Sequence, residues 1–261
     1  MTRLRTWAPF VLYLCLQLAV VVLLYLGVRP PLNAWLQALP DWLLPEGFFS
    51  YPAHLLLIPS LLYNRAMLPM GLFLESLLQA AATWIFLRYA LAERLPGLRS
   101  AIAEVKFGYA QFVVLWLANY VLLRGSSELF NLAVGDLWLG FARRRAALDL
   151  VHVMTGAVFN SLLAYGTVVI LMERTSLGAT LIGALRAFGR HWLATCTTVF
   201  AGTLLSLPLA RLLENAPDWI SRFNPEVVLA VTGLSLLTGA LASYWVSAVL
   251  TFWYLLHRTG T

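Results

Sequence analysis

The residue with the most distinctive chemistry in this chain is a carboxylic acid inside an apolar segment. Glu75 lies within the apolar run 66–87, and Gln79 follows four residues later on the same helical face. A carboxylate near the middle of a bilayer is costly, so such a residue is by default a functional hypothesis. Burial favours the protonated form of a carboxyl group, so Glu75 could relay protons or bind a cation. The alternative is structural pairing with an arginine or histidine of a neighbouring helix.

A second group of candidate binding residues lies at the start and middle of the apolar run 150–172. Asp149 and His152 are three residues apart, and Asn160 is two helical turns beyond the histidine. A carboxylate that orients an imidazole is common in catalytic and metal sites. The alternative is an aspartate at a helix start and a histidine at the membrane interface.

Motifs of known enzyme classes are missing from the sequence. The four histidines are scattered, and there is no H-E-x-x-H, G-x-S-x-G or P-loop pattern. The two cysteines, Cys15 and Cys196, lie in apolar runs, where small apolar packing is the simplest role. We therefore expect no metal and no cofactor, and the motifs do not favour an enzyme.

The composition defines the class of protein. Of the 261 residues, 61% are hydrophobic and only 11% are charged, and the mean hydropathy is +0.78. So few charges exclude a soluble globular protein, a disordered protein and a collagen-like protein. The net charge of +6 resides mainly in short loops, which indicates a membrane surface rather than nucleic acid as partner. The prediction is an all-α integral membrane protein in the lipid bilayer.

Hydropathy divides this single polytopic domain, residues 1–261, into six transmembrane helices. Their predicted ranges are 7–28, 66–87, 107–123, 150–172, 192–210 and 227–256. Short amphipathic interfacial helices are predicted near 32–39, 95–106, 128–141 and 176–189. Residues 52–63 are apolar but only about half a membrane long. They are either re-entrant or an extension of the second span, kinked at Pro69.

Stripes of small residues predict which spans pack closely. Residues four apart share one helical face, and small residues let helices approach in lipid. The predicted packing residues are Gly156 in the fourth span, Thr198, Gly202 and Ser206 in the fifth, and Ser235, Gly239, Ser243 and Ser247 in the sixth. In the third span, Gln111 and Asn119 share a face and should form interhelical hydrogen bonds. The first span has only Gln17 as a strongly polar residue, so it should lie at the periphery or meet a partner protein.

Two of the longer loops suggest a parallel internal repeat of about 80 residues, a device that is common in transporters. The pair Glu93-Arg94 recurs as Glu173-Arg174, and an amphipathic segment and a new span follow each pair. The alternative is that any loop between two spans carries basic residues and an amphipathic helix.

The distribution of basic residues predicts the orientation. With the N-terminus inside, the inner segments hold ten of the 18 lysines and arginines, which is a weak positive-inside bias. Both termini are then cytoplasmic, in a plasma membrane of the bacterial inner-membrane kind.

Three functions are compatible with these features. The first is a permease-like or transporter-type component in which Glu75 is the leading residue. The second is a structural or assembly subunit that binds another membrane protein or forms a homo-oligomer. The third is a membrane enzyme acting on lipid at the outer interface, with Asp149, His152 and the run Arg143–Arg145 contacting a phosphate headgroup.

Overall fold

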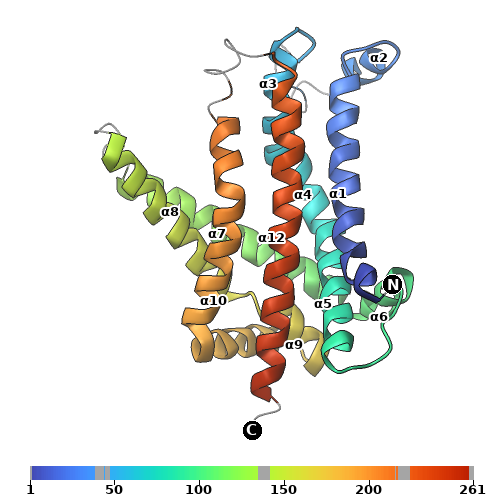
Figure 1. Cartoon of the computed structure of the whole chain (residues 1–261), viewed down its shortest axis with the longest axis vertical. Coiled ribbons are helices and arrows are strands. Elements are labelled where there is room, and N and C mark those ends of the chain that lie inside the picture. The colour runs from blue at the N-terminus through green and yellow to red at the C-terminus, as the bar shows by residue number, and fades with distance from the viewer. Residues whose placement is uncertain are drawn as a thin grey trace. The chain divides into compact units, whose positions relative to one another are not determined.

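Helices are the only regular secondary structure in the part of the chain that the structure describes. This computed structural model describes residues 2–38, 44, 48–134, 142–214, 216 and 224–258 (Figure 1). No strand occurs in these ranges, so the predicted all-α class is confirmed. Six helical segments are long and apolar enough to cross a membrane: Arg5–Leu26, Ala53–Ala90, Leu98–Phe130, Ala147–Glu173, Leu177–Leu213 and Val227–Leu256. Each overlaps one of the six predicted ranges.

The helices follow one another through short connections. Their bounds are α1 (Thr2–Leu26), α2 (Leu32–Gln37), α3 (Ala53–Leu61), α4 (Met67–Met70), α5 (Ser76–Ala90), α6 (Leu98–Val105), α7 (Tyr109–Val134), α8 (Ala142–Leu162), α9 (Gly166–Glu173), α10 (Leu177–Glu214) and α12 (Val227–Arg258). By backbone contacts the chain divides into two units. Unit 1 comprises Met1–Pro9, Ser76–Leu204 and Ser243–Thr261, and unit 2 comprises Phe10–Glu75 and Leu205–Ala242.

The segment 52–63, for which two placements were open, extends the second long helix. From Ala53 to Ala90 the chain is helical throughout, with wide π-helical turns at Leu62–Ala66 (η1) and Gly71–Glu75 (η2). Pro69 cannot donate a hydrogen bond to the carbonyl of Arg65, which lies in the first wide turn. The helix therefore adapts by local widening and continues past the proline.

Three of the four short helices predicted at the interface correspond to helical segments of the structure. Helices α2 and α6 fall within 32–39 and 95–106, and the predicted helix 176–189 is the first part of α10. That part ends at a kink at His191, where φ is −131° and ψ is 26°.

The helix predicted at 128–141 is not separate as far as the structure describes it. Residues 128–134 continue α7, whereas 135–141 lie outside the described residues. An ion pair one turn apart, Arg124 to Glu128 at 3.1 Å, supports the helix through this polar stretch.

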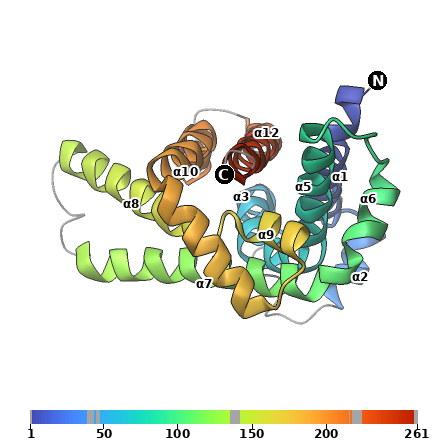
Figure 2. The same ribbon diagram turned by 90° about the horizontal axis from the view of Figure 1, so that it is seen from below.

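Unit 1 has its core where α5, α6, α7 and α9 meet. Its buried members include Ile85, Val105 and Ile170. Two glycines allow close approach there: a Cβ on Gly166 would lie 2.6 Å from both methyl carbons of Leu115, and one on Gly108 would lie 3.1 Å from Ile170. Helix α8 contacts α7, and the two helices diverge toward the end of α7 and the start of α8 (Figure 2).

The predicted stripes of small residues are only partly buried. Gly202 and the packing residues Thr198, Ser235 and Ser247 are buried, and Ser206 is half-buried. By contrast, a Cβ on Gly156 or Gly239 would meet no other heavy atom within 4 Å, and Ser243 is exposed. Close packing at these three positions therefore stays a prediction. Four residues turn a helix by about 40° more than one full turn, so a stripe spaced by four drifts away from the contact face.

Unit 2 is held together by α1, α3 and α12. Its apolar cluster includes Val21 of α1, Leu55 and Ile58 of α3, and Leu236 of α12. Helix α1 therefore contributes to the core of this unit, and its polar residue Gln17 is buried there. Only 22% of the apolar window of this span is buried, which agrees with the expected peripheral position, and the span packs by one side.

The proposed internal repeat stays a prediction. Each of the two loops leads into a short helical segment, which begins at Leu98 in the first and at Leu177 in the second. Among the described residues, Ala92 and Arg174 are the non-glycine residues with positive φ, and each follows the end of a helix. The two loops thus share a plan of helix, turn and short helix, although the turn and the short helix are not spaced alike in them.

The close approach at Gly166 makes a testable prediction. We expect Gly166→Ala to destabilise the protein by about 1–3 kcal/mol, the usual cost of overpacking, because both Leu115 methyls lie 2.6 Å from the new Cβ and the leucine side chain must shift within the core. Gly156→Ala is the matched control and should be neutral or stabilising by up to about 1 kcal/mol. Thermal unfolding of the detergent-solubilised variants measures both. Equal stability of the two variants would contradict the packing at Gly166.

Candidate functional site

Glu75 is the last residue of the second wide turn of the long helix Ala53–Ala90. The turn begins at the buried Gly71, and the carboxylate side chain of Glu75 is half-buried. Wide turns inside α-helices often occur at functional sites, because the extra residue disturbs the regular hydrogen-bond ladder. The sequence prediction identified the acid but not this backbone feature.

Three side chains join Glu75 in what we call the Glu75 cluster: Tyr13, Gln17 and Met67. The phenol of Tyr13 donates a hydrogen bond to Oε2 of Glu75 at 3.1 Å and lies 3.7 Å from Sδ of Met67. The amide Nε2 of Gln17 donates to the same sulfur at 3.4 Å. All four residues belong to unit 2. The cluster thus places one carboxylate within a short chain of hydrogen-bond donors.

Apolar packing on α1 positions the two donors of this cluster. Tyr13, Gln17 and Val21 are spaced by four residues and lie on one side of α1. Val21 is buried against α3 in the apolar cluster of unit 2. The same face that packs therefore carries the phenol and the amide, which fixes their height on the helix relative to Met67 and Glu75.

The chemistry available to the cluster is proton exchange. A tyrosine hydroxyl is both a donor and an acceptor, and a carboxyl group becomes a donor when it is protonated. The phenol can therefore donate to the charged carboxylate and accept from the neutral acid. Hard metal cations prefer oxygen ligands, whereas the thioether of Met67 is soft. Since Tyr13 and Gln17 direct hydrogens toward Glu75 and Met67, the cluster fits a proton better than a metal cation.

Gln79, which was expected to act with Glu75, has different surroundings. Its side chain is exposed, and its backbone carbonyl accepts a hydrogen bond from Thr83 at 2.9 Å. Its role in binding stays a prediction.

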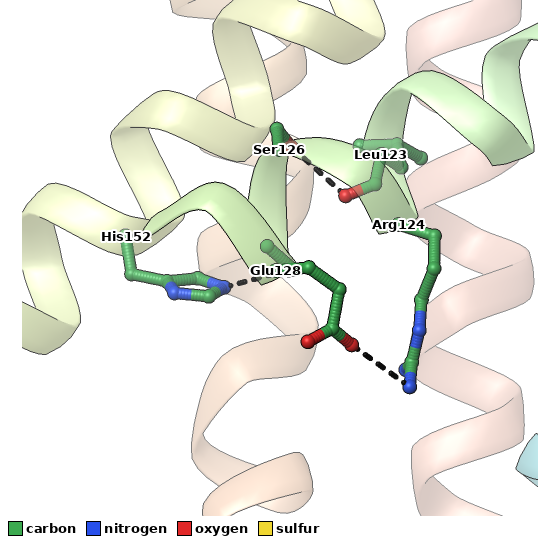
Figure 3. A network of polar contacts seen from close by, with 6 residues as sticks. Leu123, Arg124, Ser126, Glu128 and His152 are labelled. Carbon is green, nitrogen blue, oxygen red and sulfur yellow. Dashed lines mark hydrogen bonds and ion pairs between the residues drawn. The ribbon is translucent and has the colours of Figure 1, made fainter. Parts of the chain in front are cut away.

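His152 forms a hydrogen bond with a serine on the neighbouring helix. Figure 3 shows the imidazole pointing from α8 toward α7, where Nε2 lies 3.0 Å from Oγ of Ser127. The ring of Phe130 stands edge-on to the imidazole, with centroids 4.8 Å apart. Asp149 is half-buried one turn earlier on α8. The side chains of Arg143–Arg145, predicted to contact a headgroup, lie outside the described residues.

A second polar pair joins α7 and α8 two turns further along. Nδ2 of Asn119 donates to Oδ1 of Asn160 at 2.8 Å. On both helices the two polar positions are separated by the same number of residues, as antiparallel helices require. Gln111 donates to the backbone carbonyl of Thr175 at 3.1 Å. The predicted hydrogen bond between helices is confirmed for Asn119, whose partner is Asn160, whereas Thr175, the partner of Gln111, lies in the connection between α9 and α10.

Sequence reasoning missed Tyr13, Gln17, Met67 and Ser127 as members of these polar sites. A usable signal existed for two of them, because Tyr13 and Gln17 are four residues apart in an otherwise apolar span. Met67 and Ser127 carry no such signal, because their partners come from helices remote in sequence. Within the described ranges, no group of three or more histidine, cysteine, aspartate or glutamate residues could hold a metal ion.

Comparison with protein families, curated proteins and solved structures finds no match to this chain. The class that the structure defines is therefore an all-helical protein with six helices long and apolar enough to span a membrane.

The asparagine pair makes a prediction about stability. A double-mutant cycle with Asn119→Ala and Asn160→Ala should give a coupling energy of about 0.6 kcal/mol, and at most about 1.7 kcal/mol, as for other interhelical hydrogen bonds in membranes. Unfolding in detergent mixtures of graded denaturing strength measures it. The control cycle combines Asn119→Ala with Asn64→Ala, whose amide bonds Ser60 of its own segment, and should be additive. A coupling energy no larger than in the control cycle would contradict the hydrogen bond between Asn119 and Asn160.

Proposed function

We propose that this chain is a multi-pass membrane protein of the transporter type, in which Glu75 exchanges protons during transport. Six long apolar helices support the membrane location, as do the many large apolar side chains exposed along them, since lipid favours such surfaces. We further propose that both termini are cytoplasmic, in an inner membrane of the bacterial kind, as the weak charge bias suggests.

The observation that carries the transport proposal is the hydrogen bond from Tyr13 to Glu75. It joins an ionisable group in one apolar helix to a titratable hydroxyl in another, and ionisable residues inside membrane helices mark proton relays and ion paths. A helix with a wide turn at the same residue can change its local hydrogen bonds more easily than a regular helix. Protonation of Glu75 would change its bond with Tyr13 and thereby couple proton uptake to the contact between α1 and the second long helix.

Proton flux into liposomes tests the role of Glu75. Protein is reconstituted with a pH-sensitive dye inside, and acid is added outside while a potassium ionophore balances charge. We expect wild-type protein to acidify the lumen faster than empty liposomes, and Glu75→Gln to lower the rate to that of empty liposomes, because the amide cannot take up a proton. The flux should not require sodium.

Two further variants sharpen this experiment. Tyr13→Phe should lower the flux roughly tenfold, since a hydrogen bond to a charged group contributes about 1.5–3 kcal/mol. Tyr25→Phe, on the same helix, and Glu104→Gln, an exposed acid of α6, are matched controls that should leave the flux unchanged. A Glu75→Gln protein with wild-type flux would remove Glu75 from the mechanism.

A second candidate function, a lipid-directed membrane enzyme, is favoured by the contact of Ser127 with His152. A serine hydroxyl within hydrogen-bond distance of an imidazole is the arrangement of an activated nucleophile and its general base. In such a reaction, Oγ of Ser127 attacks an acyl carbonyl carbon, Nε2 of His152 takes the hydroxyl proton, and the same nitrogen returns it to the departing alcohol. The product is an acyl-serine that water hydrolyses.

A covalent probe tests this second candidate. If Ser127 is activated, a fluorophosphonate should label the purified full chain, and Ser127→Ala or His152→Ala should abolish the labelling. Ser126→Ala is the control, because the hydroxyl of Ser126 donates to the backbone carbonyl of Leu123 at 2.8 Å. No labelling of wild-type protein would leave the hydrogen bond as a structural link between α7 and α8.

A further inference from the structure

The first part of α10, from Leu177 to Arg190, runs in a different direction from the rest of that helix. The kink at His191 turns it, so that in Figure 2 the first part runs across the view and the second part is seen nearly end-on. One side of this segment is covered within unit 1: Thr180 and Ala184 are fully buried, and Ala184 packs with Tyr165. The opposite side has no cover from the described residues.

This uncovered side combines apolar and basic residues in an ordered way. At 100° per residue, Ile182 and Leu185 form one edge, and Arg186 and Arg190 form the adjacent edge. Ile182 is 60% exposed and Leu185 46%, and both arginines are exposed. Just beyond the kink, Trp192 is 57% exposed and Leu193 63%. We call these six residues the α10 surface.

The two arginines of this surface have no acidic partner among the described residues. No acidic residue occurs in the sequence between Glu173 and Glu214. Neither Arg186 nor Arg190 belongs to an ion pair among the described residues, in contrast to Arg88 with Glu93 and Arg124 with Glu128. The other short helix of this kind, α6, differs because it exposes an acid, Glu104, as well as Arg99.

We propose that the α10 surface binds the headgroups of anionic phospholipids at the membrane interface. This inference rests on the proposed membrane location and not on proton exchange at Glu75. An amphipathic helix with aliphatic and tryptophan residues beside arginines lies in the interface plane, with its apolar edge at the acyl boundary. The guanidinium groups of Arg186 and Arg190 then lie at the level of the lipid phosphates, which they recognise through paired N–H donors. The negative charge that neutralises these two arginines then comes from the lipid phosphates.

Lipid binding to the full chain tests the proposal. Protein in mild detergent is titrated with phosphatidylglycerol and phosphatidylcholine, and native mass spectrometry counts the retained lipids. Wild-type protein should prefer phosphatidylglycerol. Arg186→Gln with Arg190→Gln should reduce that preference by roughly 30-fold, from about a factor of five for each arginine near an anionic surface. Arg186→Lys with Arg190→Lys should keep most of the preference, because the charge remains.

The matched control removes the same charge elsewhere. Arg29→Gln with Arg124→Gln lowers the net charge equally, at one residue that contacts Tyr25 and one that pairs with Glu128, and should leave the preference intact. An unchanged preference in the double glutamine variant of α10, or an equal loss in the control, would overturn the proposal. Failure of the membrane location would differ, because neither lipid would then be retained by any variant.

Discussion

The constraint on which this structure depends is that polar groups in long apolar helices must find hydrogen bonds within the chain. Several hydroxyl groups meet it locally, by donating to the carbonyl four residues earlier on their own helix. The residues that do so are Thr83, Thr155, Ser161, Thr195, Thr197, Thr198, Thr203, Thr232 and Thr251. Such a bond satisfies the donor without involving another helix, and among these residues Thr195 in addition contacts the hydroxyl of Tyr165.

The few polar side chains that bond across helices therefore carry most of the information about register. Asn119 with Asn160 and Ser127 with His152 fix the alignment of α7 and α8 at two heights. Tyr165, almost fully buried, lies 2.9 Å from the hydroxyl of Thr195 and links the start of α9 to α10 just beyond its kink. In lipid, apolar side chains give little preference for one register over another, whereas these pairs are lost if a helix slides by one turn.

The sequence was informative where physical causes are local. Hydropathy located six long helices because the free energy of burying a segment is nearly a sum over its own residues. It could not show that Ala53–Ala90 is continuous, since Pro59 and Pro69 favour a break and two wide turns absorb them. Close packing at Gly166 rather than Gly156 depends on which neighbour faces each glycine, and that depends on tertiary contacts. The candidate site follows the same rule. Glu75 is evident in the sequence as an acid inside an apolar run, whereas its contact with Tyr13 depends on how the helices pack.

The Glu75 cluster differs from the pairs that fix the helix register in the free energy needed to desolvate it. Neutral pairs such as Asn119 and Asn160 need little free energy to desolvate, whereas a carboxylate needs several kcal/mol, and removal of both partners in favour of apolar residues is often neutral or stabilising. A purely structural link between α1 and the second long helix would therefore be made more cheaply by a neutral pair, such as the bond that Tyr63 gives to Ser235 at 3.0 Å in the same unit. That unit thus uses a neutral pair to join the second long helix to α12, whereas Glu75 stands at a wide turn, where the backbone hydrogen bonds are irregular. Because a purely structural link does not need a carboxylate, the free energy of burying Glu75 favours a role in which its protonation changes.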